Sequence, residues 1–238
     1  MADAQGPSPE LSTEADLVGQ HMDALYTFGK TGRIDGGRGP APPILHLTLA
    51  PLGHQLGIRW DVPDRLAAGI ADAVRDEPVT GQLVKLPARL EALMELVSTR
   101  TAGPSMYAGP AFLVPRVMKR VGRIEWITNA SKELLFTHFG DWGDLEEAQP
   151  IAAIVKRGRA VAICYSARTG RSGAEAGVET AADFRGRGLA PRVVAAWAAA
   201  VQARGLVAMY STSWENLASQ AVARKLNMTQ YATDFHVS

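Results

Sequence analysis

The 238-residue chain has 47% hydrophobic and 21% charged residues, an ordinary composition for a soluble globular protein. Its 25 basic and 24 acidic residues leave a net charge of +1, which argues against binding to nucleic acid through a broad positive face. The single cysteine, Cys164, excludes an internal disulfide and fits a reducing cytoplasm, and no apolar run approaches the roughly 20 residues of a membrane span.

The chain begins with a polar segment. Residues 1–15 lack the basic start and apolar middle of a signal peptide, and we expect them to be disordered. Residues 21–28 suit either a short helix or a strand, and residues 29–43 predict a glycine-rich turn. Apolar and polar side chains alternate over residues 44–53, which predicts a strand. With the composition, these features predict a cytoplasmic protein with no membrane partner.

Two amphipathic helices are expected next. Residues 61–78 and residues 87–100 both place apolar side chains three to four positions apart, as one face of a helix does. Glycine and proline are frequent in residues 101–112, which predicts a linker. We therefore expect an N-terminal segment of unassigned role at residues 16–108 and a second domain at residues 109–238.

The second half of the chain alternates strands and helices more clearly. Residues 132–142 predict a short helix that runs into an aromatic loop, and residues 150–168 predict a hairpin that turns at Arg157 and Gly158. This order of elements predicts an α/β fold. The remaining predicted elements are strands at 174–180, 206–212 and 228–237 and helices at 189–205 and 216–227.

A turn with two Arg-Gly pairs, DFRGRGLAPR at residues 183–192, joins a predicted strand to a predicted helix. The first N–H groups of a helix have no intrahelical partner and lie at the positive end of the helix dipole, where phosphate binds. Gly186 and Gly188 lack the Cβ atoms that would block close approach, and Arg185 and Arg187 add positive charge. The turn alone is compatible with a phosphate site or with a tight turn that carries solvated arginines.

The sequence RGRGLA within this turn resembles the Arg/Gln-x-x-Gly-x-Gly/Ala signature of the GNAT superfamily of acyl-CoA-dependent N-acyltransferases, with Arg185, Gly188 and Ala190 at the signature positions. NLASQAVARKLNM resembles the later Asn-x-x-Ser/Ala helix of the family, in which Asn227 replaces the usual glycine. The resemblance covers roughly residues 110–238. It implies a mixed, mostly antiparallel central sheet flanked by helices, to which the N-terminal segment adds further α/β structure. The matching residues of the later helix are Asn216, Ser219, Lys225 and Leu226.

The resemblance also implies acetyl-CoA as co-substrate, bound where two central strands splay apart. Its pantetheine arm is expected to pair with the strand edge, and its pyrophosphate is expected on the amides of the turn. The cofactor residues so implied are Val178, Glu179, Thr180, Arg185, Gly186, Arg187, Gly188, Leu189, Ala190, Asn216 and Ser219.

In this family the acceptor amine attacks the thioester directly in a ternary complex, so a base must remove a proton from the amine. We predict that Glu179 is this base, because it lies on the strand beside the cofactor; Glu175 on the same strand points to the same face. The alternative is that Glu179 faces solvent or pairs with an arginine.

The acid that protonates the leaving thiolate is harder to assign. Many family members have a tyrosine seven residues after the Asn, where this chain has Ala223. Ser219 lies one helical turn earlier on the same face, and we predict it as the acid or as a pantetheine contact. Tyr210 and Ser211 lie on the adjacent strand, and water could also supply the proton.

The acceptor is expected to be a primary amine on a small molecule or a peptide. The family resemblance places Phe136, Phe139 and Trp142 at the acceptor wall, and Trp214 could add to it, although each of these aromatic residues could equally belong to the core. A non-catalytic acyl-CoA-binding regulatory module is the alternative function, and a homo-oligomer is open.

Other motifs carry no chemistry that we can assign. GKT at residues 29–31 lacks the first glycine of a phosphate-binding P-loop, since Ala24 stands there. No Gly-x-Ser-x-Gly elbow is present, and Cys164 lies in an apolar strand. We predict no metal site, because the histidines show no metal-ligand spacing; they are His21, His46, His54, His138 and His236.

Overall fold

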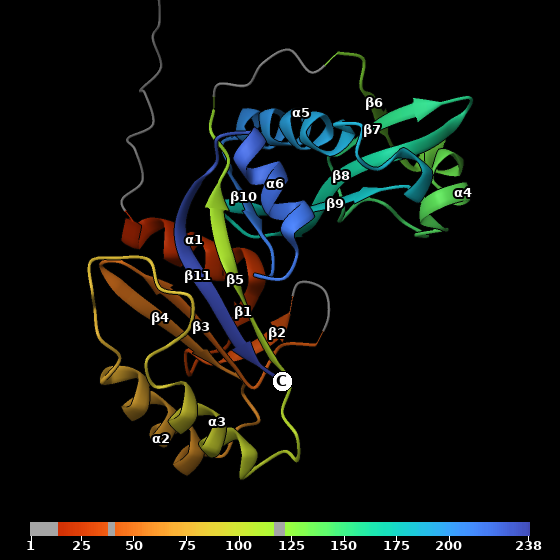
Figure 1. Ribbon diagram of the computed structural model, residues 1–238. Coiled ribbons are helices and arrows are strands. Elements are labelled where there is room, and N and C mark those ends of the chain that lie inside the picture. Colours follow the sequence, from red (N-terminus) through yellow and green to blue (C-terminus); the bar gives the residue numbers. More distant parts are fainter. Residues whose placement is uncertain (1–13, 38–40, 117–121) are drawn as a thin grey trace, which may run out of the picture.

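The computed structural model describes residues 14–37, 41–116 and 122–238. In this part of the chain a nine-stranded sheet has the order β4-β3-β11-β5-β10-β9-β8-β7-β6 (Figure 1). Neighbouring strands are antiparallel except β9 and β10, which are parallel. The strands are β3 (Leu45–Ala50), β4 (Gly53–Ile58), β5 (Met106–Leu113), β6 (Glu125–Ile127), β7 (Ile151–Lys156), β8 (Arg159–Thr169), β9 (Gly173–Thr180), β10 (Val207–Ser211) and β11 (Thr229–Val237). The mixed, mostly antiparallel α/β sheet predicted above is confirmed.

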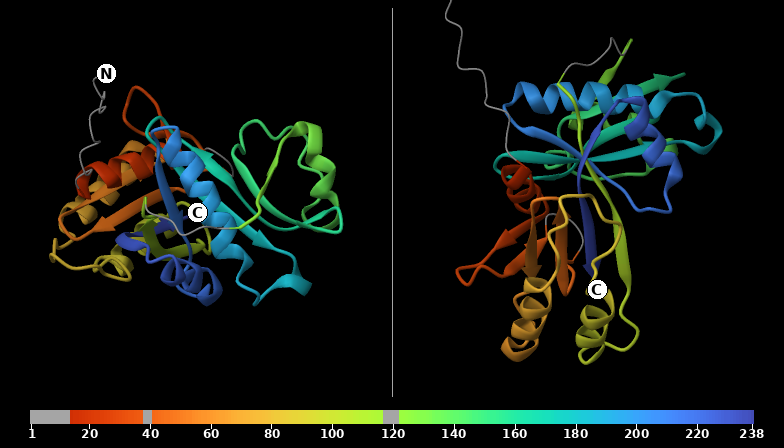
Figure 2. Two further views of the ribbon diagram at one scale, coloured as in Figure 1. Left: turned by 90° about the horizontal axis from the view of Figure 1, so that it is seen from above. Right: turned by 60° about the vertical axis from the view of Figure 1, so that its left-hand side comes forward.

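Helices cover this sheet at opposite ends of the molecule. Helices α5 and α6 pack on the strands of the C-terminal half, whereas α2 and α3 pack on β3 and β11 at the other end (Figures 1 and 2). None of the helices in the described residues has the length and apolar character needed to cross a membrane. The helices are α1 (Glu14–Leu25), α2 (Asp64–Arg75), α3 (Leu90–Ser98), α4 (Phe136–Phe139), α5 (Leu189–Ala203) and α6 (Leu217–Lys225), with short 3₁₀ helices η1 (Asn129–Leu134) and η2 (Ala182–Phe184).

Helix α5 fixes the predicted phosphate turn to the core. Its buried side chains include Val193, Trp197 and Val201, which are spaced four apart and so share one face. The indole Nε1 of Trp197 donates a hydrogen bond to Ser166 Oγ on β8 at 3.1 Å, so the buried N–H is satisfied. Burial of each large apolar side chain contributes about 1.5–3 kcal/mol. These contacts hold α5 firmly in the core, so the turn at its N-terminus has a fixed position.

The prediction of a linker at residues 101–112 is wrong, because β5 occupies most of it and pairs with both β10 and β11. The glycine that suggested flexibility has a packing role. A Cβ on Gly109 would lie 1.8 Å from the carbonyl oxygen of Thr212, so only glycine allows this close approach of two backbones. The expected boundary after residue 108 falls inside β5, and the sheet continues across it.

The N-terminal segment is part of the same sheet. Strand β3 pairs with β11, the last strand of the chain, and β4 pairs with β3 at the sheet edge. Residues 21–28, which suited a helix or a strand, are both: α1 ends at Leu25 and β1 (Tyr26–Phe28) follows. The expected turn at residues 29–43 contains β2 (Ile34–Gly37), the partner of β1. Most of the expected disordered segment, residues 1–13, lies outside the described residues.

Candidate active site

Strands β9 and β10 diverge near the middle of the sheet, and we call the point where their pairing ends the vertex. They pair only between Gly173–Glu175 and Val207–Met209. Beyond this vertex β9 continues to Thr180 and pairs with β8 alone, so its other edge carries no strand partner in the described chain. An unpaired strand edge offers N–H and C=O groups to an extended ligand.

The glycine-rich turn lies where β9 leads into α5. Gly186 has φ 74° and Gly188 has φ 69°, both in the left-handed region that favours glycine. Gly188 is the N-cap residue of α5, and no side chain caps the helix. A Cβ at either glycine would meet no atom within 4 Å, so the space above the turn is open. The first amides of α5 therefore face an uncovered space that suits an anion.

The turn's two arginines bind back to the turn itself. Arg185 Nε donates to the carbonyl of Thr180 at 3.2 Å, and an Nη of Arg187 donates to the carbonyl of Asp183 at 2.8 Å. The Arg187 guanidinium also lies 5.1 Å from the centre of the Phe184 ring. Both arginines are exposed, so their charge is held at the mouth of the turn. Of the other predicted cofactor residues here, Leu189 is buried and Ala190 is half-buried.

Helix α6 brings the later motif to β10. Asn216 caps the helix by accepting a hydrogen bond from Ser219 N at 3.0 Å. Ser219 Oγ is hydrogen-bonded to the phenol oxygen of Tyr210. Burial raises the pKa of Tyr210 to about 12, so this phenol keeps its proton at neutral pH. The helix ends at Lys225, and Asn227 just beyond it has φ 50°, the left-handed conformation that glycine or asparagine commonly adopts after a helix.

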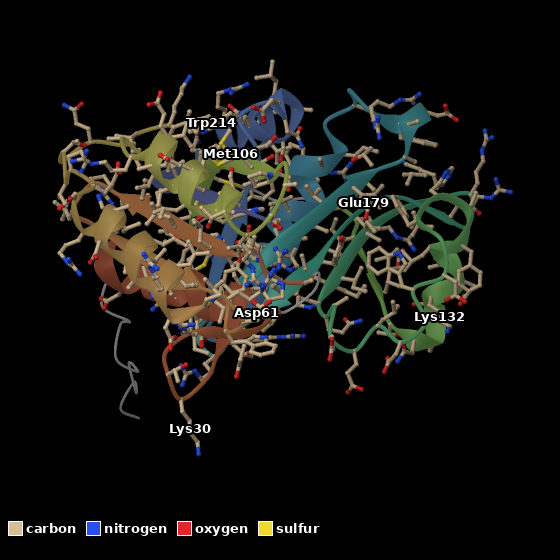
Figure 3. All side chains as sticks on the ribbon, turned by 90° about the horizontal axis from the view of Figure 1, so that it is seen from below. Lys30, Asp61, Met106, Lys132, Glu179 and Trp214 are labelled. Atoms are coloured by element: carbon tan, nitrogen blue, oxygen red, sulfur yellow. The ribbon has the colours of Figure 1, made fainter. Side chains whose placement is uncertain are left out.

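The two glutamates of β9 share a face but not an environment. Alternate residues of β9 pack beneath α5, whereas Glu175 and Glu179 point to the opposite face. Glu175 is buried, with 2% of its surface exposed, and its Oε1 accepts a hydrogen bond from Ser211 Oγ at 2.5 Å. Glu179, labelled in Figure 3, is exposed. Its Oε1 lies 3.5 Å from the phenol oxygen of Tyr165.

A cavity of about 270 Å³ opens beside Glu175 at the vertex. Its walls combine the two halves of the chain: β8, β9, β10 and β11 meet α1, β1, β3 and β5 there. The lining residues are Leu25, Tyr26, His46, Tyr107, Ala167, Arg168, Glu175, Ala176, Ser211, Asp234 and His236. Glu175 and Ser211 lie on the face of the sheet that borders the cavity, whereas Tyr210 lies on the opposite face, which α5 and α6 cover. The vertex is therefore accessible to different side chains from its two faces.

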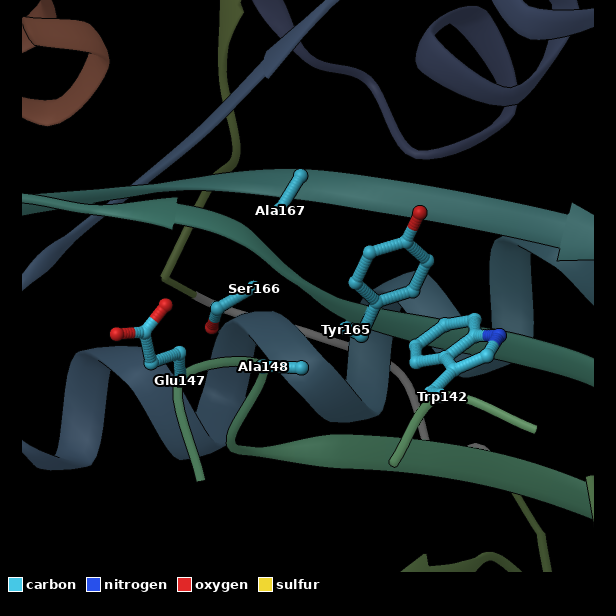
Figure 4. A pocket seen from close by; sticks show the side chains of 6 residues that line it. All are labelled: Trp142, Glu147, Ala148, Tyr165, Ser166 and Ala167. Atoms are coloured by element: carbon cyan, nitrogen blue, oxygen red, sulfur yellow. The ribbon is translucent and has the colours of Figure 1, made fainter. Parts of the chain in front are cut away.

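A second hollow of about 270 Å³ lies along β8 and shares Ala167 with the first (Figure 4). Trp142 lines it, stacked edge-on against Tyr165 with ring centres 4.6 Å apart. Phe139 supports this indole, because its carbonyl accepts a hydrogen bond from Trp142 Nε1 at 2.8 Å. Phe136 is exposed and lines neither hollow.

Trp214, the fourth aromatic residue of the predicted acceptor wall, lies well away from Glu179 (Figure 3). It packs at the edge of the core under α2 and α3, and its Nε1 donates to the carbonyl of Lys85 at 3.1 Å. The structure therefore brings only Trp142, with Phe139 behind it, near the cavities.

A buried polar network that sequence spacing missed forms the floor of the Glu175 cavity. His21 Nε2 donates to Asp234 Oδ2 at 2.8 Å, and His21 Nδ1 is hydrogen-bonded to the phenol oxygen of Tyr231 at 2.8 Å. His46 Nε2 lies 3.3 Å from the other Asp234 oxygen, and its Nδ1 lies 2.9 Å from the phenol oxygen of Tyr26. These residues come from three distant segments, so no motif joins them. The only sequence signal is a polar residue inside an apolar strand.

Electrostatics make this network an ion pair. Burial lowers the pKa of His21, but the carboxylates of Asp234 and Glu175 together raise it more, so the pKa lies above its ordinary value. The same contacts hold the pKa of Asp234 far below its usual range despite burial. Ligand atoms of His21, His46 and Asp234 lie within 4.8 Å of one another, close enough to hold a cation. Protein hydrogen bonds already engage each of the ring nitrogens, which accounts for the arrangement as a hydrogen-bonded network.

Comparison with known proteins identifies the part of the chain that carries the turn. Residues 123–233 match a family model described as GNAT acetyltransferase. A GCN5-related N-acetyltransferase-like protein from Streptococcus suis 89/1591 has a TM-score of 0.51 at 17% identity, over 83% of this chain and 85% of that one. A GNAT-family acetyltransferase from Colwellia psychrerythraea has a TM-score of 0.48 at 14% identity, over 77% of this chain and 76% of that one. No curated protein matches the chain.

The family-model match confirms the resemblance drawn from the two motifs. The likeness to the Streptococcus suis structure covers 83% of the chain, much more than residues 123–233, so the shared fold includes part of the N-terminal segment. At 17% identity this likeness concerns the fold alone.

Proposed function

We propose that the chain, an acyltransferase whose residues 123–233 match the GNAT acetyltransferase family model, transfers an acetyl group from acetyl-CoA to a primary amine in a ternary complex. The observation that carries this proposal is the two-sided vertex of β9 and β10. One face presents the open turn and the Tyr210–Ser219 pair, and the other presents a cavity with a buried carboxylate. A thioester at the vertex would meet both faces.

For the cofactor, we propose that the pyrophosphate lies on the amides of the turn and the pantetheine along the free edge of β9. The open space above Gly186 and Gly188 supports the first assignment, and the unpaired edge from Ala176 to Thr180 supports the second. The proposed contacts are Val178, Glu179, Thr180, Arg185, Gly186, Arg187, Gly188, Leu189, Ala190, Asn216 and Ser219. The thioester is the end of the arm farthest from the pyrophosphate, so it lies toward the vertex.

This direction along β9 favours Glu175 over Glu179 as general base. Glu175 is at the vertex and lines the cavity, whereas Glu179 is four residues nearer the turn and exposed. At about 3.3 Å per residue, the two glutamates are about 13 Å apart along the strand. A thioester bound at one position can therefore lie beside only one of the two glutamates. Glu179, the residue predicted from the sequence, remains the competing assignment.

The proposed step balances as follows. The carboxylate removes one proton from the ammonium group of the acceptor, and the neutral amine nitrogen attacks the thioester carbonyl carbon. A C–N bond forms, the C–S bond breaks, and the thiolate takes a proton to leave as CoA thiol. The second proton of the attacking nitrogen is lost as the amide forms. The net products are the acetylated amine, CoA thiol and one proton.

For the thiolate, we propose the Tyr210–Ser219 pair as proton donor in place of the tyrosine that Ala223 replaces. Both hydroxyls lie on the face covered by α5 and α6, and they are hydrogen-bonded to each other. A phenol with a pKa of about 12 carries a proton throughout the physiological range and can pass it through the serine hydroxyl.

We further propose that the N-terminal segment serves the acceptor side, because Leu25, Tyr26 and His46 line the cavity, whereas no residue of the turn lines it. A cytoplasmic location is also a proposal, which the free, buried thiol of Cys164 supports. The acceptor could be a small molecule or a peptide amine. The competing function is a non-catalytic acyl-CoA-binding module.

Two measurements on the purified chain test the function. Calorimetric titration with acetyl-CoA should give binding, and a panel of primary amines should give acceptor-dependent release of CoA thiol. Binding without thiol release for any amine would favour the regulatory module. Absence of acetyl-CoA binding would contradict both functions.

A further inference from the structure

Two opposite charges face each other across β8 and β9 without pairing. Arg168 lies directly opposite Glu175 in the antiparallel register of these strands. Directly opposite residues have Cβ atoms about 4.5–5.5 Å apart, which is close enough for an arginine and a glutamate to form a salt bridge. The Arg168 side chain forms no ion pair and no hydrogen bond with any residue that the structure describes. Glu175 Oε2 is buried and has no hydrogen-bond partner there, but it lies 3.8 Å from His21 Nδ1 in an ion pair.

A bulge in β8 accounts for the separation. The register shifts between Ser166 and Arg168, so Ala167 is the extra residue. Bulges turn the following side chain away from its regular direction and recur beside active sites. Arg168, Ala167 and Glu175 all line the same cavity, so both charged groups border one space.

The remaining charges of this cavity are already neutralised. Asp234 is paired with His21 at 2.8 Å. Burial lowers the pKa of His236 to about 4, so this imidazole is neutral at pH 7. The cavity therefore offers a ligand one half-buried guanidinium without an ion-pair partner and one buried carboxylate oxygen, Glu175 Oε2, whose ion pair with His21 Nδ1 is long at 3.8 Å. A half-buried guanidinium without a partner is costly, so a ligand carboxylate that pairs with Arg168 is favoured, and Glu175 Oε2 can still accept a hydrogen bond from the amino group of that ligand.

We infer that the acceptor is a small free amino acid, whose carboxylate pairs with Arg168 while its amino group meets Glu175. This inference rests on the proposed function and names its substrate class. A guanidinium binds a carboxylate through two parallel hydrogen bonds, which fixes the amino acid in orientation. The amino group then lies beside the carboxylate that we propose as base. Pockets for drug-sized ligands occupy roughly 300–1,000 Å³, so a cavity of about 270 Å³ suits a smaller molecule.

The test uses the twenty standard amino acids, each compared with its α-amide. The amide keeps the amino group and removes the negative charge that Arg168 would bind. With the wild-type chain and acetyl-CoA, CoA thiol release should be faster for at least one amino acid than for its amide, by about 10–100-fold in kcat/KM. This range corresponds to one charge-assisted contact.

The variant Arg168→Gln removes the charge and should lower kcat/KM for the amino acid by about 10–100-fold, mainly through KM, while the rate with the amide changes little. Arg168→Lys keeps the charge and should recover part of the loss. Arg159→Gln is the matched control, because Arg159 is an exposed arginine on the same strand. Equal preference for amino acid and amide, or an equal loss with both acceptors in Arg168→Gln, would overturn the inference.

A binding measurement separates this inference from the proposed function. Calorimetric titration of the same amino acids into the chain saturated with CoA requires no turnover. Binding that Arg168→Gln abolishes would support the amino acid site even if no thiol were released, in which case the catalytic proposal alone would fail. If neither titration nor turnover distinguishes any amino acid from its amide, the amino acid site is wrong, whatever other amine the enzyme accepts.

Discussion

His21 and Asp234 form a buried ion pair with a nitrogen–oxygen distance of 2.8 Å, and this pair joins α1 to the last strand of the chain. The side chain of His21 has 0% of its surface exposed and that of Asp234 has 4%. Because β11 runs between β3 and β5, the pair connects the N-terminal segment to the centre of the sheet. Asp234 also lines the Glu175 cavity, so the ion pair holds one wall of the proposed acceptor site in place.

The first prediction concerns this pair and pH. Because the pKa of His21 is raised on folding, the pair's contribution to the free energy of unfolding is complete below pH 6.5, the ordinary histidine pKa. This contribution is lost as the pH rises through the folded-state pKa. Because the pKa of Asp234 is lowered on folding, its contribution to the free energy of unfolding is present above pH 3.8, the ordinary aspartate pKa. It is lost as the pH falls through the folded-state pKa. The pair should therefore stabilise the folded chain most between pH 3.8 and pH 6.5.

Asp234→Asn should lower the free energy of unfolding by about 3–5 kcal/mol, because it leaves a buried imidazole without its counter-charge. Urea unfolding at pH 5.5 and pH 8.5 is the measurement; the wild type should be more stable at pH 5.5, and the variant should lose most of this difference. Asp72→Asn is the control, since the exposed Asp72–Arg75 pair contributes about 0–1 kcal/mol. An unchanged pH dependence in Asp234→Asn would show that other groups cause it.

The second prediction concerns the N-terminal segment. Tyr26 lines the cavity and lies 2.9 Å from His46 Nδ1 through its phenol oxygen. Tyr26→Leu should raise KM for the acceptor about tenfold while the Kd for acetyl-CoA stays unchanged, because the wall changes but the turn does not. Trp60→Leu is the control, since Trp60 is 64% exposed and does not line the cavity. A weaker affinity for acetyl-CoA in Tyr26→Leu would mean that this segment also supports the cofactor.

The third prediction concerns the phosphate turn. Valine at Gly188 would be strained by the left-handed backbone, so the clean test uses Asn and Asp, which tolerate this conformation. The two side chains have nearly the same shape, and both can cap α5. Gly188→Asp should weaken acetyl-CoA binding at least about tenfold more than Gly188→Asn, because it adds a negative charge beside the pyrophosphate. Equal affinities in calorimetry would contradict a pyrophosphate on this turn.

The fourth prediction concerns the proton donor. A thiolate can leave without help, so Tyr210→Phe and Ser219→Ala should each lower kcat only modestly, towards the low end of the roughly 10²–10⁴-fold range of acid–base groups. If the two hydroxyls act as one unit, the double variant should be no slower than the slower single variant. Wild-type rates should rise with pH through one ionisation and show no falling limb up to pH 10, because burial raises the pKa of Tyr210 to about 12. A falling limb below pH 10 that Tyr210→Phe removes would contradict this environment.

The sequence predicted the local structure of the proposed cofactor side better than that of the proposed acceptor side. Gly188 and Asn216 belong to continuous motifs, in which local backbone geometry dictates residue type, so their places at the starts of α5 and α6 could be read directly. The acceptor side depends on strand order. Arg168 meets Glu175, and Asp234 meets His21, only because the sheet brings distant segments together. No periodicity in one chain encodes that order.

The linker error has a related cause. Gly109 and Pro110 suggested flexibility because local propensity gives such residues to loops. In the folded chain Gly109 allows the Thr212 backbone to approach, a requirement set by tertiary packing. The polar residues of β3 and β11 offered the missed clue, since His46, Thr48 and Asp234 interrupt apolar strands on their buried face. Buried polar groups need partners, so such positions predict a network even when its members cannot be matched.

The central claim is that acyl transfer takes place at the vertex of β9 and β10 with Glu175 as base. The most direct measurement is kcat for CoA thiol release by Glu175→Gln and Glu179→Gln with one confirmed acceptor, with Ser219→Ala as reference. Glutamine is nearly isosteric, and its amide oxygen can still accept the hydrogen bond from Ser211. We expect Glu175→Gln to lower kcat by about 10²–10⁴-fold, far more than Ser219→Ala, and Glu179→Gln to stay near the wild-type rate. The larger loss in Glu179→Gln, or full activity in Glu175→Gln with unchanged acetyl-CoA binding, would contradict the account.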